Sequence, residues 1–303
     1  MYLSRVMLKP DIINNTQLSR VLADRTYGVH RLLWDLFDQP ERDFLYREEV
    51  AREQVAQPGV KGEPVYYLLS PQPPKTDSPL FEVQSKPFRP DFTAGQHLSF
   101  RLRANPVVTR DRQRHDLVMD EQRRFLQRLC EAQGLAEHGG KADMRKRLLE
   151  TPHPGALHDW LSSYLSQTRY FAESGRRHTL HTLLDLAMQE AIAQRLMHWL
   201  TQNPSRQGIF TLAERVIEDD FTDDVRTVPA FEWQAYNAHP IPEKAPSAAQ
   251  LAHSKHKARF LSVDMSGELI VTDPQRFTAL LQQGIGAAKG FGCGLMLVKP
   301  VHY

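Results

Sequence analysis

Hydrophobic and polar positions alternate over several short segments in the first third of the chain, which predicts β-strands. One longer segment, 18–37, places its hydrophobic residues three and four apart, as an amphipathic helix does. Proline- and glycine-rich stretches at 57–64 and 70–79 are typical of connecting loops. A strand, a helix and then further strands predict a small α+β sandwich. The strands are expected at 2–9, 43–50, 65–69, 81–86 and 98–103.

From about residue 112 to 204 the pattern changes to runs of helix-forming residues. We expect a helical insertion there, followed by a helix that opens a second α+β unit. That unit is expected to contain strands at 208–217, 259–263, 268–271 and 295–298, with a short helix at 274–283. The predicted fold class is α+β. Its parts are an N-terminal domain over 1–110, the insertion over 111–185 and a C-terminal domain over 186–303.

The composition is that of an ordinary globular protein, because the 303 residues are 41% hydrophobic and 24% charged. No apolar stretch approaches the ~20 residues that a bilayer-spanning helix needs, and the N-terminal segment lacks the pattern of a signal peptide. The two cysteines, Cys130 and Cys293, are far apart, so no disulfide framework is expected. We therefore expect a cytoplasmic protein.

The net charge is only +2, from 38 basic and 36 acidic residues, so the total charge does not indicate a nucleic-acid partner. Basic residues do cluster locally. Five arginines lie between 101 and 114, and the segment HSKHKAR at 253–259 leads into a predicted strand. Either cluster can bind phosphate or form a solvated loop. The acidic run at 218–224 is interpreted as a solvated loop or a protein-facing patch.

A glycine-rich segment near the end of the chain, GIGAAKGFGCG at 284–294, is the most unusual local feature. Glycine has no Cβ atom, so such a loop can turn sharply and aim backbone amides at an anion. The GxGxxG dinucleotide pattern does not fit, because Lys289 stands where the third glycine is needed, and no P-loop can be drawn. A phosphate-rich polymer is a better candidate ligand than a mononucleotide. The alternative is a turn-rich connection before the last strand.

The segment 24–37 carries the candidate chemistry. Tyr27 and His30 are three residues apart on the predicted helix, which puts their Cβ atoms roughly 5–6 Å apart. They lie off the hydrophobic stripe together with Arg31 and Trp34, so an exposed pair is expected. Histidine titrates near neutrality and tyrosine can orient or donate a proton, so the pair suits proton transfer on RNA. The alternative is a surface histidine without a chemical role. The hydrophobic stripe consists of Val29, Leu32, Leu33, Leu36 and Phe37.

Four features occur in a fixed order along the chain. They are the N-terminal MYLS, the Tyr27-x-x-His30 helix with an apolar run ending in Leu-Phe, FRLRANP at 100–106, and the tail GIGAAKGFGCGLMLV at 284–298. Together they resemble the CasE family, the CRISPR-associated endoribonuclease of type I-E Cascade. The resemblance covers about 1–110 and 186–303, whereas the residues from about 112 to 185 exceed what we expect of the family.

The resemblance implies two ferredoxin-like (RRM-like) domains in tandem, with the glycine-rich loop in the second. It also implies binding of the stem-loop of a CRISPR repeat transcript and one cut at the 3′ base of the stem, with no metal ion or other cofactor. The ribose 2′-OH attacks the phosphate and leaves a 2′,3′-cyclic phosphate. The implied partners are the crRNA and other Cascade subunits, with no membrane contact. Two other functions stay open: a non-catalytic subunit that caps an RNA hairpin, and an interaction protein whose insertion recruits another factor.

The site residues implied by the resemblance are those that match its motifs. Tyr27 and His30 match the catalytic tyrosine and histidine, and Lys289 with the loop amides is expected to contact phosphate. The glycines of that loop are Gly284, Gly286, Gly290 and Gly292. The further RNA-binding candidates are Arg31, Trp34, Arg110, Arg112, Lys255, Lys257 and Arg259. The HxxH segments at 178–181 and 253–256 have no nearby cysteine, so no metal site is expected. We expect Cys293 to be buried in loop packing rather than to act as a nucleophile.

Overall fold

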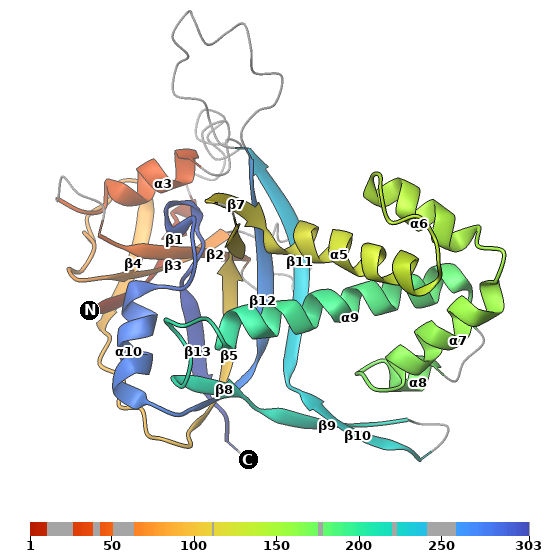
Figure 1. Cartoon of the computed structure of the whole chain (residues 1–303). Coiled ribbons are helices and arrows are strands. Elements are labelled where there is room, and N and C mark those ends of the chain that lie inside the picture. The colour runs from red at the N-terminus through yellow and green to blue at the C-terminus, as the bar shows by residue number, and fades with distance from the viewer. Residues whose placement is uncertain are drawn as a thin grey trace, which may run out of the picture.

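The computed structural model describes residues 1–10, 27–38, 43–50, 64–110, 112–174, 178–219, 223–240 and 259–302 (Figure 1). Two of the predicted RNA contacts, Lys255 and Lys257, lie outside these residues. For Tyr27, Arg110 and Arg259 the backbone is described but the side chain is not. The described part is a mixed α/β structure with antiparallel sheets and a group of helices on one side.

The first sheet has four antiparallel strands in the order β2-β3-β1-β4. They are β1 (Tyr2–Leu8), β2 (Leu45–Val50), β3 (Pro64–Ser70) and β4 (Phe81–Pro87). Alternate residues of β1 are buried, as the sequence pattern predicts. Helix α3 (Tyr27–Trp34) packs on the sheet through Val29 and Leu33, whose side chains join the core around Val6 and Phe81. The four strands expected in this part of the chain are therefore confirmed.

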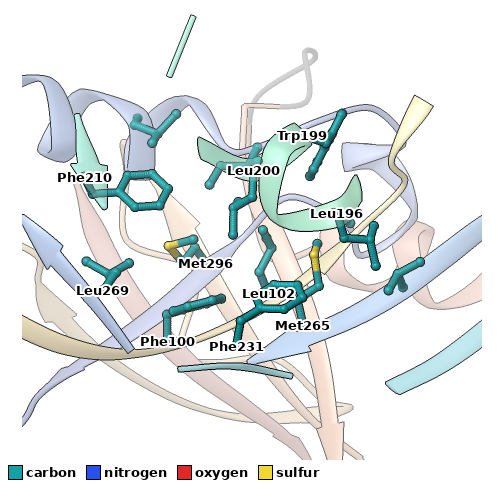
Figure 2. Close-up of a cluster of buried hydrophobic side chains, with 14 of the residues drawn as sticks. Phe100, Leu102, Leu196, Trp199, Leu200, Phe210, Phe231, Met265, Leu269 and Met296 are labelled. Carbon is teal, nitrogen blue, oxygen red and sulfur yellow. The ribbon is translucent and has the colours of Figure 1, made fainter. Parts of the chain in front are cut away.

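The second sheet has the order β11-β12-β5-β13, and β8 pairs with the end of β12. Its strands are β5 (His97–Ala104), β8 (Phe210–Leu212), β11 (Phe231–Pro240), β12 (Arg259–Val271) and β13 (Met296–Pro300). Helices α9 (Leu180–Thr201) and α10 (Pro274–Gln283) contribute to one hydrophobic core with this sheet. Figure 2 shows Leu196 and Leu200 of α9 over Leu102 of β5, at the centre of that core.

Strand β5 belongs to a different sheet from the one expected. The sequence pattern predicts 98–103 as a strand of the N-terminal domain, but β5 pairs with β12, with Ala104 opposite Val263, and with β13, with Leu102 opposite Met296. Alternation predicts a half-buried strand and carries no information about which strands flank it. The chain therefore leaves the first sheet after β4, and not near residue 110.

The strand expected at 208–217 corresponds to two strands, β8 and the first strand of a hairpin. The second strand of that hairpin, another hairpin and one long strand have no counterpart among the predicted strands. The first hairpin pairs β6 (Val107–Arg110) with β7 (Gln113–Asp116), and the second pairs β9 (Glu214–Glu218) with β10 (Val225–Pro229). The predicted acidic run lies at the turn of the second hairpin, where the amide of Asp219 donates to the carbonyl of Asp224 at 2.9 Å. The long strand, β11, has a bulge between Gln234 and Asn237 that interrupts its alternation, so no clear strand pattern marks it.

The insertion is helical, as the sequence predicts. It contains α5 (Leu117–Ala132), α6 (Lys141–Leu149), α7 (Pro154–Leu165) and α8 (Phe171–Ser174), and these helices lie beside the sheets in Figure 1. The helices share a hydrophobic core of their own with the first half of α9. Leu184 of α9 lies in this helical core, whereas Leu196 of the same helix lies in the core of the second sheet. One continuous helix therefore joins the insertion to the second sheet, and the boundary expected at 185 falls inside it.

Candidate nucleic-acid interface

His30 lies on α3 inside a group of aromatic rings. Its ring centroid is 5.7 Å from that of Trp34, 5.9 Å from that of Phe44 and 6.0 Å from that of Tyr46. The residue is 8% exposed, so the expectation of an exposed histidine is wrong. The reason is that the chain entering β2 brings Phe44 and Tyr46 onto the side of α3 that the helical wheel leaves open. The imidazole therefore lies within a cluster of aromatic rings.

Tyr27 is the first residue of α3, three residues before His30. The helical backbone therefore puts the Cβ atoms of the two residues on neighbouring turns, as the sequence predicts. Arg31 is exposed on the same helix, and Trp34 is half-buried against His30. Three of the four predicted α3 residues thus have described side chains, and His30 and Trp34 are in direct ring contact.

The glycine-rich loop at 284–294 packs against β2, the strand that also covers His30. Gly284 has a φ of 73°, and a Cβ atom there would lie 2.8 Å from Leu45 Cδ1. Gly292 has a φ of 77°, and a Cβ atom there would lie 3.2 Å from the Tyr46 ring. Both positions therefore need glycine for the backbone conformation and for the close approach to β2. The loop is a structural contact between the two sheets as well as a candidate phosphate site.

The amides of the loop are not equally placed for phosphate. The amide of Gly284 donates to the carbonyl of Leu280 at 2.9 Å and so ends α10. The amide of Gly294 donates to the carbonyl of Arg103 at 2.8 Å. The Gly284 amide is therefore already bound within the protein, and the predicted RNA contact at Gly284 would have to use another atom of that residue. Gly286, Gly290 and Gly292 keep their place as candidates.

Lys289 begins a short 3-10 turn, η1 (Lys289–Phe291), that contacts both α3 and β2. Its ammonium group donates to the carbonyl of Gln283 at 2.5 Å. The hydroxyl of Tyr46 lies 3.5 Å from the carbonyl oxygen of Gly290 in the same turn. The structure thus brings His30, Tyr46 and Lys289 to one end of the molecule, although 259 positions of the sequence separate His30 and Lys289.

The arginine cluster of the sequence divides into two parts. Arg103 makes two hydrogen bonds to the Asp264 carboxylate, at 2.9 and 3.0 Å, and Arg101 lies 3.9 Å from Glu49. These two arginines therefore hold β5 against β12 and β2. Arg112 and Arg114 are instead exposed on the β6–β7 hairpin, where Arg112 has a φ of 61°.

The hairpin is fixed beside the glycine-rich loop. Asn105, just before β6, forms a β-bridge with Ala287 of the loop, and its side-chain amide donates to the carbonyl of Leu261 at 2.6 Å. Figure 1 shows β7 at the same end of the molecule as α3 and η1. Arg112 is therefore carried to the end of the molecule that holds His30, on a segment for which the sequence predicted no strand.

Two polar residues of this region were missed by sequence reasoning. Arg47 of β2 is 4% exposed and lies 2.5 Å from Glu49 and 3.4 Å from Asp264; burial lowers its pKa, against the effect of these two carboxylates. His239 of β11 hydrogen-bonds Ser262 at 2.7 Å and stacks on Phe260. Burial and the charge of Arg103 lower the pKa of His239. Neither residue belongs to a recognisable motif, so only the fold reveals them.

The remaining signals have structural explanations. Cys293 is fully buried, and burial raises the pKa of its thiol to about 12, which confirms that it belongs to loop packing. His178 lies 2.7 Å from Glu173, and His181 lies 3.3 Å from Asp185, so the first HxxH segment forms two separate pairs. The described residues contain no cluster of three or more metal-ligating side chains. No helix among them has the length and apolar character needed to cross a membrane.

Comparisons with known proteins identify the family of the chain and proteins of similar fold. The model of a family described as CRISPR associated protein matches residues 1–300, and the family resemblance drawn from the motifs is thereby confirmed. A structure of the CRISPR endoribonuclease Cse3 bound to 19 nt RNA is similar, with a TM-score of 0.55, 21% identity and 99% of each chain covered. Thermus thermophilus Cse3 bound to an RNA representing a pre-cleavage complex gives a TM-score of 0.50 and 19% identity, with 99% of this chain and 98% of that one covered. No curated protein sequence matches the chain.

Proposed function

Because this chain belongs to the CRISPR associated protein family, we propose that it is an endoribonuclease that processes CRISPR repeat transcripts. It binds the stem-loop of the repeat and cuts once at the 3′ base of the stem. The observation that carries the proposal is the position of His30 beside Tyr46 and the glycine-rich loop, in a fold similar to that of an endoribonuclease bound to RNA. The other partners are the subunits of a Cascade complex, in which the protein stays on its product.

The proposed architecture is a tandem of ferredoxin-like units. The second unit runs β5, α9, β11, β12, α10 and β13, which is a βαββαβ order once the insertion and the hairpins are set aside. Its strand order, β11-β12-β5-β13, matches that of the first sheet, β2-β3-β1-β4, strand for strand. The first unit has α3 between its first two strands and an irregular segment at 71–80 before its last. The repeated strand order supports a tandem arrangement.

The proposed reaction needs proton transfer and no redox chemistry. The 2′-oxygen of the nucleotide before the cut attacks the phosphorus atom, and the bond from phosphorus to the 5′-oxygen breaks. The 2′-OH proton passes to a base and the 5′-oxygen receives a proton, which leaves a 2′,3′-cyclic phosphate and a 5′-OH. His30 acts as the base or the acid, and Tyr27 orients the phosphate or shares the proton transfer.

The proposed RNA surface surrounds His30. Arg31 and Trp34 lie on α3, Arg112 lies on the β6–β7 hairpin and Lys289 lies on η1. Arg110 and Arg259, at ends of β6 and β12, and Lys255 and Lys257 complete the predicted set. Basic side chains on several elements suit a duplex stem, whose shape and phosphates are recognised more than its buried base edges. We expect binding to weaken steeply as salt concentration rises.

A second candidate function is that of a subunit that caps the RNA hairpin without cutting it. The burial of His30 favours this reading, because an imidazole that is 8% exposed has little surface with which to contact RNA. The test is to incubate the protein in EDTA with repeat RNA, beside an RNA with 2′-deoxyribose before the cut. We expect one cut of the first RNA and none of the second. Tight binding of both RNAs without a cut supports the capping function. If the protein neither binds nor cuts the RNAs, both functions are contradicted.

A further inference from the structure

The helical insertion contains a cleft that the proposed reaction does not use. Helices α5, α7 and α9 enclose an open cleft of about 400 Å³. Its walls combine aromatic rings with charged groups, and the side chains that matter here are Glu121, Arg128, Trp160, Tyr164, Arg195 and His198. These residues lie outside the segments that carry the family resemblance, with the exception of the two on α9.

Two aromatic rings form a flat platform in this cleft. Trp160 and Tyr164 lie one turn apart on α7, and their rings are nearly parallel, at 7°, with centroids 5.6 Å apart. Trp160 is 37% exposed, which leaves its outer face open to a ligand. Burial, with the nearby Glu190 charge, raises the pKa of Tyr164 to about 12, so its hydroxyl remains a neutral donor. A platform of this kind suits a stacked planar ring.

The charges around the platform are mainly positive. The carboxylate of Glu121 is buried and lies 2.6 Å from the Arg128 guanidinium, which neutralises it. Arg195 has no carboxylate partner among the described residues, and His198 is exposed beside it on α9. A cationic ligand held by cation–π contact is therefore disfavoured. A nucleotide fits both features, because it combines a planar aromatic base with a negatively charged phosphate.

Two of the helices that line the cleft lead to elements of the proposed RNA surface. Helix α5 starts directly after β7, so Glu121 lies only about 8 Å along the helix axis from the hairpin that carries Arg112. On α9, His198 precedes Trp199, whose ring approaches Gly286 so closely that a Cβ atom there would lie 3.2 Å away. Helix α5 therefore connects the cleft with the β6–β7 hairpin, and helix α9 connects it with the glycine-rich loop.

We propose that this cleft binds a nucleotide of the single-stranded RNA that flanks the stem-loop. The base stacks on Trp160, the phosphate pairs with Arg195, and the Glu121–Arg128 pair supplies acceptors and donors to the base edge. The identity of the RNA rests on the proposed function, whereas the chemistry of the cleft does not. The insertion thereby extends RNA binding beyond the stem.

The test compares three RNAs: the stem-loop alone, the stem-loop with an unpaired extension of about ten nucleotides on its 5′ side, and the stem-loop with the same extension on its 3′ side. We expect Trp160→Ala and Arg195→Glu each to weaken binding of one extended RNA by about tenfold, with the stem-loop alone bound and cut as before. Trp160→Phe should retain most of the affinity, because phenylalanine keeps a stacking face. The matched control is Arg89→Glu, an exposed arginine between β4 and β5, which should change nothing. If the wild type and Trp160→Ala bind each of the two extended RNAs equally well, the proposal is overturned and a protein becomes the expected ligand of the cleft.

A second measurement separates this proposal from the proposed function. A short single-stranded RNA unrelated to any repeat is titrated against the wild type and Trp160→Ala, with melting curves to check folding. Binding that depends on Trp160 supports the nucleotide cleft even if the stem-loop is neither bound nor cut. If this short RNA does not bind to the wild type, the proposal is overturned even if the stem-loop is cut. A mononucleotide that binds as tightly as the RNA would assign the cleft to a free nucleotide and overturn the RNA assignment.

Discussion

The imidazole of His30 stacks on the phenol ring of Tyr46, with the two ring centroids 6.0 Å apart and an interplanar angle of 28°. The hydroxyl of the same tyrosine lies 3.5 Å from the carbonyl oxygen of Gly290. One side chain of β2 therefore touches both the predicted catalytic histidine and the glycine-rich loop. The geometry makes the position of the loop and the orientation of His30 depend on each other.

Tyr46 should consequently affect cleavage without touching RNA itself. Tyr46→Phe keeps the ring and removes the hydroxyl, whose contact with Gly290 is long, so we expect a change in stability below about 1 kcal/mol and near-normal cleavage. Tyr46→Ala removes a buried ring and should cost about 3–5 kcal/mol. Single-turnover cleavage below the melting temperature of each variant is the measurement. Equal cleavage by Tyr46→Ala and the wild type would show that His30 does not need this support.

Gly284 should be intolerant of a side chain. Its φ of 73° and the 2.8 Å approach to Leu45 make us expect Gly284→Ala to lose about 1–3 kcal/mol of stability. Gly155 is the matched control, because it lies in α7 with nothing within 4 Å of a Cβ atom. Gly155→Ala should be neutral or stabilising by up to about 1 kcal/mol. Urea unfolding measures both, and equal effects would contradict the packing of the loop on β2.

Asp264 should be important for stability because it pairs with two arginines, Arg47 and Arg103. Asp264→Asn removes a negative charge beside the buried Arg47. We expect it to lower the free energy of unfolding by about 2–3 kcal/mol, which allows for the partial exposure of the carboxylate. The control is the exposed Arg215–Glu232 pair, where Glu232→Gln should cost less than about 1 kcal/mol. Thermal unfolding at neutral pH distinguishes them. A loss at Asp264 no larger than that at Glu232 would contradict the role of the network.

Cys293 should make the protein less stable in alkali. Its pKa is raised by burial from 9.0 to about 12, so the folded state holds the thiol proton that the unfolded state releases. The stability that depends on this proton is fully present below about pH 9 and is lost as the pH rises towards 12. The free energy of unfolding should fall by about 1 kcal/mol between pH 9 and pH 10. Cys293→Ala should remove this part of the pH dependence. Parallel urea titrations at the two pH values measure it, and identical slopes for both proteins would contradict the prediction.

Local patterns in the sequence predict local structure well in this chain. The alternation over β1 and the helical runs of the insertion are properties of neighbouring residues, so they are visible without the fold. The pairing of β5 with β12 and β13 is a long-range choice, and alternation is the same whichever strand lies beside it. Strand β11 is difficult to predict for a local reason, because its bulge interrupts the alternation of hydrophobic and polar residues.

The candidate site shows the same limit. The spacing of Tyr27 and His30 follows from helix geometry, so the sequence alone places them on neighbouring turns. The burial of His30 depends on Phe44 and Tyr46, which reach α3 only through the sheet. The sequence likewise marks the glycine-rich loop as unusual, but its contact with Leu45 could not be read from either segment alone.

The proposed function depends above all on His30 acting as a catalytic residue of an RNA-cutting enzyme. The most direct test measures RNA cleavage and RNA binding together, in EDTA, for the wild type, His30→Ala and His30→Gln. Melting curves show that the variants are folded, since His30 is buried and its loss can affect stability. We predict a cut by the wild type, with cleavage lowered at least about a hundredfold in both variants and binding within about threefold of the wild type. Cleavage at the wild-type rate by either folded variant would contradict the claim.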